Sequence, residues 1–156
     1  MRSALLVAAI VGGVLAPLAG SPYRSSQLDV MRLAATIEKE DDHVTAAELA
    51  QWIRDRKAGL HVIDLRTPAE FASYHVPTSI NVSLETLVQR DFPRGDTIVL
   101  VSDGGGHAAQ GWVLMQARGF ANVYFLRGGM QEWETELQKP GENRRYFGGV
   151  RKGGGC

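Results

Sequence analysis

Short apolar runs alternate with amphipathic stretches along the middle of the chain. Four runs have the length and the apolar content of buried strands: residues 60–65, 79–83, 96–102 and 121–126. The stretches between them carry apolar residues at helical spacing. Short buried strands that alternate with helices are typical of a parallel sheet covered on both faces. The pattern therefore predicts a small α/β domain over residues 44–139, with four strands and no internal repeat.

Capping signals mark where two of the helices begin. Thr45 is followed three residues later by Glu48, and Thr67 by Glu70, with Pro68 at the first helical position. In such a capping box each side chain satisfies a backbone N–H of the other residue. Both helices are therefore expected to start directly after their threonine.

The remaining helices are predicted from stop signals and apolar spacing. The first helix is expected to end at Gly59 and the helix over 107–118 at Gly119, because glycine favours helix ends. Shorter helices are predicted over 83–88 and 130–137. The three tryptophans, Trp52, Trp112 and Trp133, occupy helical positions and are interpreted as core residues.

The two ends of the chain differ from this middle part. In residues 1–21, Arg2 precedes a run without charge, which is the pattern of an export signal. Cleavage after Ser21, retention as a membrane anchor and a buried N-terminal helix are the alternatives. The first two place the domain outside the cytoplasm, in the periplasm or at the membrane. Residues 22–43 indicate a linker or a solvated helix, and residues 140–156 a flexible, glycine-rich basic tail.

Composition excludes several kinds of partner. The 156 residues include 17 basic and 17 acidic side chains, so no basic face for nucleic acid is expected. The four histidines have no paired spacing, and one cysteine cannot build a thiolate site, so no metal is predicted. No cofactor is predicted either. A dinucleotide site would need an acidic residue at the end of the strand after the glycine turn, where Arg127 stands.

The most informative stretch is "VLVSDGGGHAAQ", residues 99–110, in which a strand leads through a glycine turn into a helix. Consecutive backbone N–H groups at a helix N-terminus favour an anion. The plain alternative is that the glycines only permit a sharp turn. The predicted anion-binding residues are Ser102, Asp103, Gly104, Gly105, Gly106 and His107.

Two stretches resemble the signatures of the rhodanese superfamily. Residues 123–133, "VYFLRGGMQEW", resemble its closing signature. The first signature lies in residues 61–81 and places family-typical residues at Asp64, Arg66, Glu70, Phe71, His75, Pro77 and Asn81. The resemblance covers residues 45–138 and implies a rhodanese-like fold. It also implies sulfur transfer through a persulfide on a cysteine in the turn after the central strand, where an arginine helps to bind anionic donors.

This chain departs from the family at the reacting positions. Ser102 stands where the nucleophilic cysteine is expected, His107 where the arginine is expected, and Ala108 where a small hydroxyl residue often follows. Sulfur transfer needs a polarisable thiolate, whereas a serine hydroxyl stays protonated without a dedicated base. The turn also lacks the nucleophile-elbow pattern of serine hydrolases. His75 is interpreted as a helix-end or core hydrogen-bonding residue.

The single cysteine, Cys156, is the last residue of the sequence. Sixteen peptide units separate it from Pro140, so it can lie roughly 55 Å away from that residue. The thiol could reach the glycine turn, form a disulfide dimer, or have no role.

Three hypotheses follow. The first is an exported rhodanese-like pseudoenzyme that binds a small anion or a protein partner. The second is a sulfurtransferase that carries its persulfide on catalytic Cys156 and takes a small sulfur donor. The third is a phosphatase-like relative, which normally needs the same missing cysteine.

Overall fold

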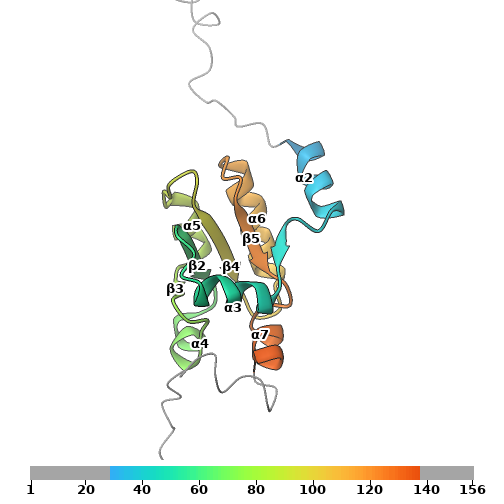
Figure 1. The fold of residues 1–156 in the computed structure, drawn as a ribbon. Coiled ribbons are helices and arrows are strands. Elements are labelled where there is room, and N and C mark those ends of the chain that lie inside the picture. The colour runs from blue at the N-terminus through green and yellow to red at the C-terminus, as the bar shows by residue number, and fades with distance from the viewer. Residues whose placement is uncertain (1–28, 138–156) are drawn as a thin grey trace, which may run out of the picture.

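The computed structural model describes residues 29–137 and shows a five-stranded parallel sheet between two layers of helices (Figure 1). The predicted α/β architecture is confirmed. The spatial order of the strands is β1-β5-β4-β2-β3. Their bounds are β1 His43–Val44, β2 Leu60–Asp64, β3 Ile80–Asn81, β4 Thr97–Val101 and β5 Val123–Leu126.

Helices cover both faces of the sheet, as is typical of parallel strands. All five residues of β4, the central strand, are buried. α3 and α7 pack on one face, and α5 and α6 on the other. The bounds of the helices are α2 Val30–Glu38, α3 Ala46–Arg54, α4 Pro68–Ser73, α5 Leu84–Gln89, α6 Gly106–Ala117 and α7 Gly129–Leu137.

Alternation along β4 divides the core into two clusters. Ile98 and Leu100 lie in the cluster under α5 and α6, whereas Val99 and Val101 lie in the cluster under α3 and α7. The tryptophan interpretation is confirmed: Trp112 and Trp133 are buried, one in each cluster, and Trp52 is half-buried against the second cluster. The Trp112 indole N–H donates to the Val123 carbonyl at 2.8 Å and ties α6 to β5.

Three expectations about the elements are corrected. The sheet has a fifth strand, β1, which pairs His43 with Phe125 at the edge of the sheet. The strand expected over residues 79–83 is limited to β3. The first domain helix ends at Arg54 rather than Gly59, because Asp55 already caps it and Gly59, at φ +68°, turns the chain into β2.

The segment before the sheet contains a helix. α2 begins after Asp29, whose side chain accepts the Arg32 N–H at 3.0 Å. None of its residues is buried, as expected of a solvated helix, although Leu33 is half-buried against the core.

The predictions for the chain ends, including the signal or anchor over 1–21 and the tail with Cys156, lie outside the described residues. Within residues 29–137, no helix has both the length and the apolar content that crossing a bilayer requires.

Candidate functional site

The glycine turn lies between β4 and α6, at the carboxyl ends of the parallel strands. The start of α7 holds it in place: the Ser102 carbonyl accepts the Met130 N–H at 2.9 Å, and the Asp103 carbonyl accepts the Gln131 N–H at 3.1 Å. Gly129 allows this approach, because a Cβ there would lie 2.2 Å from the Ser102 carbonyl oxygen. The closing signature, residues 123–133, therefore supports the turn through backbone contacts.

The N-terminus of α6 follows directly on the turn. Gly105 caps the helix at φ +87° and contributes no side-chain hydrogen bond. The N–H groups of Gly104, Gly106 and His107 have no acceptor within residues 29–137, and all three residues are exposed. Unsatisfied N–H groups at the positive end of a helix dipole favour an anion. The structure thus brings together the residues predicted for anion binding.

Ser102 is built into this turn as a structural acceptor. Its side-chain oxygen accepts the Ala108 N–H at 3.1 Å, and the residue is only 4% exposed. No histidine or carboxylate is hydrogen-bonded to this hydroxyl in the part of the chain that the structure describes. A serine without such a base is a poor nucleophile.

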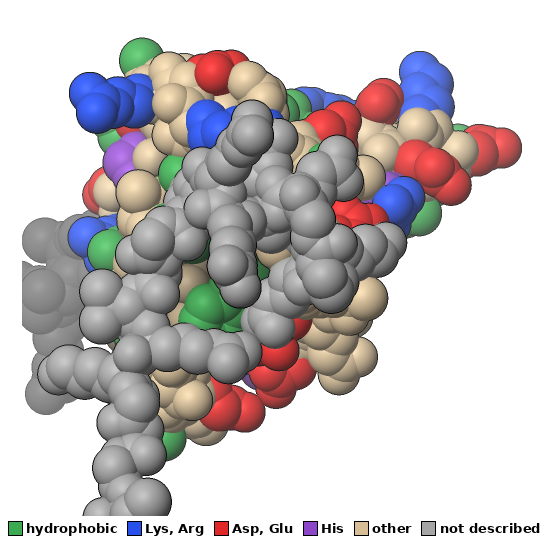
Figure 2. Space-filling view, turned by 60° about the horizontal axis from the view of Figure 1, so that its bottom comes forward, with side chains coloured by type: hydrophobic (Ala, Val, Ile, Leu, Met, Phe, Trp, Pro, Cys, Tyr) green, Lys and Arg blue, Asp and Glu red, His purple; other side chains and the backbone are tan. Residues whose placement is uncertain are grey.

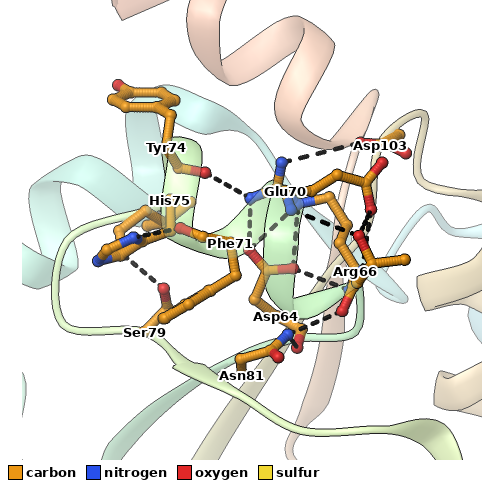
Figure 3. A network of polar contacts seen from close by, with 11 residues as sticks. Asp64, Arg66, Glu70, Phe71, Tyr74, His75, Ser79, Asn81 and Asp103 are labelled. Carbon is orange, nitrogen blue, oxygen red and sulfur yellow. Dashed lines mark hydrogen bonds and ion pairs between the residues drawn. The ribbon is translucent and has the colours of Figure 1, made fainter. Parts of the chain in front are cut away.

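A buried ion pair supports the turn from the neighbouring strand (Figure 3). The Arg66 guanidinium donates to both carboxylate oxygens of Asp64, at 3.0 Å from Nε to Oδ1 and 2.7 Å from Nη2 to Oδ2. Nη2 also donates to the Tyr74 carbonyl, and the Asn81 side-chain amide donates to the carbonyls of Asp64 and Arg66. These bonds fix the loop after β2.

Arg66 also reaches the turn itself. Its Nη1 lies 3.8 Å from the Asp103 carboxylate. Burial lowers the pKa of Arg66, but the hydrogen bonds and charge of Asp64 outweigh it, so the pKa is raised overall. Arg66 therefore stays charged, and the Asp64 carboxylate is its main ion-pair partner. Sequence reasoning assigned Arg66 to the family signature but missed this contact, because 37 positions separate it from Asp103.

The rim of the turn is acidic. The Asp103 side chain is 57% exposed, and Glu70 on α4 is exposed. Hydrogen bonds from the side chain and backbone of Thr67 hold the pKa of Glu70 below its ordinary value. In Figure 2, where the bottom of Figure 1 comes forward, Asp and Glu side chains are visible both in the upper and in the lower part of the face. A bound anion therefore meets attraction from the N–H groups and repulsion from the rim.

The remaining candidates lie apart from the turn or outside the structure. The His75 Nδ1 lies 2.8 Å from the Phe71 carbonyl oxygen, and its ring stacks on Phe71 with centroids 4.1 Å apart. Its interpretation as a helix-end hydrogen-bonding residue is confirmed. No group of three or more metal-ligating side chains occurs within residues 29–137. Cys156 lies outside the described residues.

Comparisons with known proteins agree with this architecture. The model of the rhodanese-like domain matches residues 45–136. Thiosulfate sulfurtransferase GlpE of Pseudomonas fluorescens is 33% identical over 91 residues, which cover 56% of this chain and 81% of that protein. GlpE of Pseudomonas syringae pv. syringae is 29% identical over 90 residues, which cover 56% of this chain and 83% of that protein.

Solved structures resemble the fold at lower identity. CoADR-RHD of Bacillus anthracis gives a TM-score of 0.58 at 23% identity and covers 69% of this chain and 19% of that one. A rhodanese-related protein of Thermoplasma volcanium gives 0.51 at 23% identity, covering 61% and 92%. With its parallel sheet, its glycine turn after the central strand and a family match over most of the described residues, the chain belongs to the rhodanese-like domain family.

Proposed function

We propose that this domain binds a small anion, or an acidic group of a partner protein, in the turn over residues 102–107, and that the turn itself does not carry sulfur. The observation that supports this most directly is the pattern of hydrogen bonds at the start of α6. The Ser102 oxygen is occupied by the Ala108 N–H, while the N–H groups of Gly104, Gly106 and His107 have no acceptor in the described chain.

The missing thiol is the chemical reason for a binding role. In sulfur transfer a thiolate attacks the outer sulfur of thiosulfate, a persulfide forms and sulfite leaves. Cyanide then takes the outer sulfur as thiocyanate and the thiolate is regenerated. The Ser102 hydroxyl has no hydrogen-bonded base and an oxygen–sulfur bond is a poor carrier, so this cycle does not start in the turn. We further propose that the domain works outside the cytoplasm, as the N-terminal pattern indicates.

A binding experiment tests the anion site. Titration of the full chain with thiosulfate or sulfate, followed by amide NMR, is expected to shift the signals of Gly104, Gly106 and His107, with a Kd of about 1 mM. Gly105→Ala should abolish the shifts, because the residue has φ +87° and its new Cβ would lie 3.3 Å from the Leu126 carbonyl. Gly95→Ala, which meets no atom within 4 Å, is the matched control. Shifts that survive in Gly105→Ala would argue against this site.

Restoring the thiol tests the chemical part of the proposal. In Ser102→Cys the sulfur would occupy the position that accepts the Ala108 N–H, at the start of α6. A helix N-terminus lowers a thiol pKa and favours the thiolate. We expect Ser102→Cys to form thiocyanate from thiosulfate and cyanide at least about tenfold faster than the native chain, a barrier reduction of about 1.4 kcal/mol.

The sulfurtransferase names of the relatives favour a second candidate, in which Cys156 carries the persulfide. α7 starts at the turn and ends at Leu137, and the 19 residues that follow span up to about 65 Å, enough to return to it. Native activity that disappears in Cys156→Ser would establish this candidate in place of a binding-only role. The absence of activity in both, with and without reductant, would reject it.

A further inference from the structure

Apolar side chains are exposed on α2 to an unusual degree. Of the five large hydrophobic residues that are exposed in the described chain, three lie on this helix: Val30 at 65%, Met31 at 80% and Ile37 at 52%. Val30 and Ile37 lie on one stripe with Leu33, whose half-buried side chain attaches the helix to the core. The rest of the stripe has no cover in the described chain.

α2 lies at the end of the molecule opposite the glycine turn. In a parallel sheet the segments that precede the strands gather at the amino ends of the strands, and the segments that follow them gather at the carboxyl ends. α2 precedes β1, and residues 90–96 and 118–122 precede β4 and β5. Figure 1 shows these three segments at the top, whereas α4 and α7 lie at the bottom.

The same end carries arginines that are held over aromatic rings. The Arg94 guanidinium lies 4.4 Å and that of Arg118 5.1 Å from the centre of the Phe120 ring. Arg90 lies over the Phe92 ring in a similar way. Arg118 pairs with Asp91, but no carboxylate of residues 29–137 pairs with Arg90 or Arg94. Phe120 belongs to the core cluster that receives Leu33.

An exposed apolar stripe at the same end as two arginines without a carboxylate partner in the described chain fits a surface that is apolar inside and anionic outside. A bilayer with anionic headgroups has this chemistry. Acidic residues also occur at this end: Asp29 caps the first turn of α2, and Asp91 pairs with Arg118. Glu38, Glu40 and Asp41 stand at or after the last residue of α2, towards β1. The uncharged sequence run ends at Tyr23, and the five residues before Asp29 bridge at most about 20 Å.

We infer that the end of the domain formed by α2, Arg90, Arg94 and Arg118 lies against an anionic membrane surface, so that the glycine turn faces away from the bilayer. This surface is independent of any ligand in the turn, because the surface lies at the amino ends of the strands and the turn lies at their carboxyl ends.

Site-specific labelling of the full chain tests this inference. A polarity-sensitive fluorophore is attached to Met31→Cys in a Cys156→Ser background. The matched control is Ala47→Cys, which is also exposed at the second residue of a helix, α3, at the other edge of the sheet. With vesicles of phosphatidylcholine and phosphatidylglycerol, the emission at position 31 should shift to the blue and rise severalfold, while that at position 47 stays unchanged.

A second arm tests the arginines. Vesicles of phosphatidylcholine alone should give a smaller response at position 31, and Arg94→Gln should reduce the difference between the two lipids. Equal responses at 31 and 47, no response at 31, or no dependence on phosphatidylglycerol would each overturn the inference. A blue shift without vesicles that grows with protein concentration would overturn it in favour of a second copy of this chain.

Discussion

The glycines in and beside the turn differ sharply in whether they can accept a side chain. Gly129 has φ +59°, and a Cβ there would overlap the carbonyls of Ser102 and Asp103. Gly106, two positions after the exposed Gly104, meets no atom within 4 Å when a Cβ is added and has no positive φ. The close approach of two backbones, rather than the sharpness of the turn, therefore demands glycine at 129.

This difference predicts opposite effects of the same substitution. Gly129→Ala should reduce the free energy of unfolding by about 3 kcal/mol, because the residue is strained and the contact between α7 and the turn must open. Gly106→Ala should stay within about 1 kcal/mol of the native chain, towards higher stability. Urea denaturation of both variants measures the effects, and a mild cost at Gly129 would contradict the packing described here.

The acidic rim leads to a second prediction at the residue scale. Asp103→Asn should raise the affinity of the turn for thiosulfate by about threefold, because one repulsive charge at a largely exposed position is removed and solvent screens it. Asp91→Asn, which removes an exposed charge at the opposite edge, should leave the affinity unchanged. Amide NMR titration compares the two, and equal affinities would show that the rim has no influence.

Among the elements, the capping boxes give α3 and α4 their defined starts. The Thr45 N–H donates to the Glu48 carboxylate at 2.8 Å, and the Glu48 N–H donates to the Thr45 hydroxyl at 3.2 Å. The backbone and side-chain hydrogen bonds of Thr45 hold the pKa of Glu48 below its ordinary value of 4.5. α5 begins differently, because Ser83 caps the Thr86 N–H without a carboxylate.

A pH dependence follows from this contrast. A carboxylate with a lowered pKa stabilises the fold above its unfolded pKa, and the contribution is lost as the pH falls through the folded value. Thr45→Ala should therefore cost about 1 kcal/mol near neutral pH and less under acid conditions, below the ordinary pKa of Glu48. Ser83→Ala should cost a similar amount at both, since its partner does not titrate. Urea denaturation at the two pH values distinguishes them.

At the scale of the whole molecule, a well-packed body carries one loosely attached helix. The body buries β4 completely between two clusters, whereas α2 has no buried residue and contacts the core through half-buried Leu33. Regions with few buried apolar contacts open at low free energy. The domain is therefore expected to show two levels of stability.

Native-state hydrogen exchange measures these levels. The β4 amides should exchange only on global unfolding, and the α2 amides far faster when no membrane is present. Leu33→Ala should speed exchange in α2 further while changing the unfolding of the body by less than about 1 kcal/mol, because the side chain is only partly covered. Matching exchange in α2 and β4 would show that α2 is an integral part of the body.

Local patterns in the sequence were sufficient for the order of the elements from α3 to α7, two helix starts and the position of the turn. Capping boxes, apolar runs and glycine stops act over a few residues, so they can be found without the fold. The family resemblance identified the signature residues Asp64, Arg66 and Asn81 for the same reason. It could not say which of them reach the turn.

Contacts between distant segments were decided only by the tertiary structure. β1 has two residues, too few for a recognisable pattern, and exists because β5 offers a partner edge. The approach of Arg66 to Asp103, and that of Gly129 to Ser102, depend on the spatial order of the strands. The sequence alone thus determined which elements form from α3 to α7 and that a serine, Ser102, stands in the glycine turn, whereas packing decided what surrounds that serine, because side chains far apart in the chain meet only when the sheet assembles.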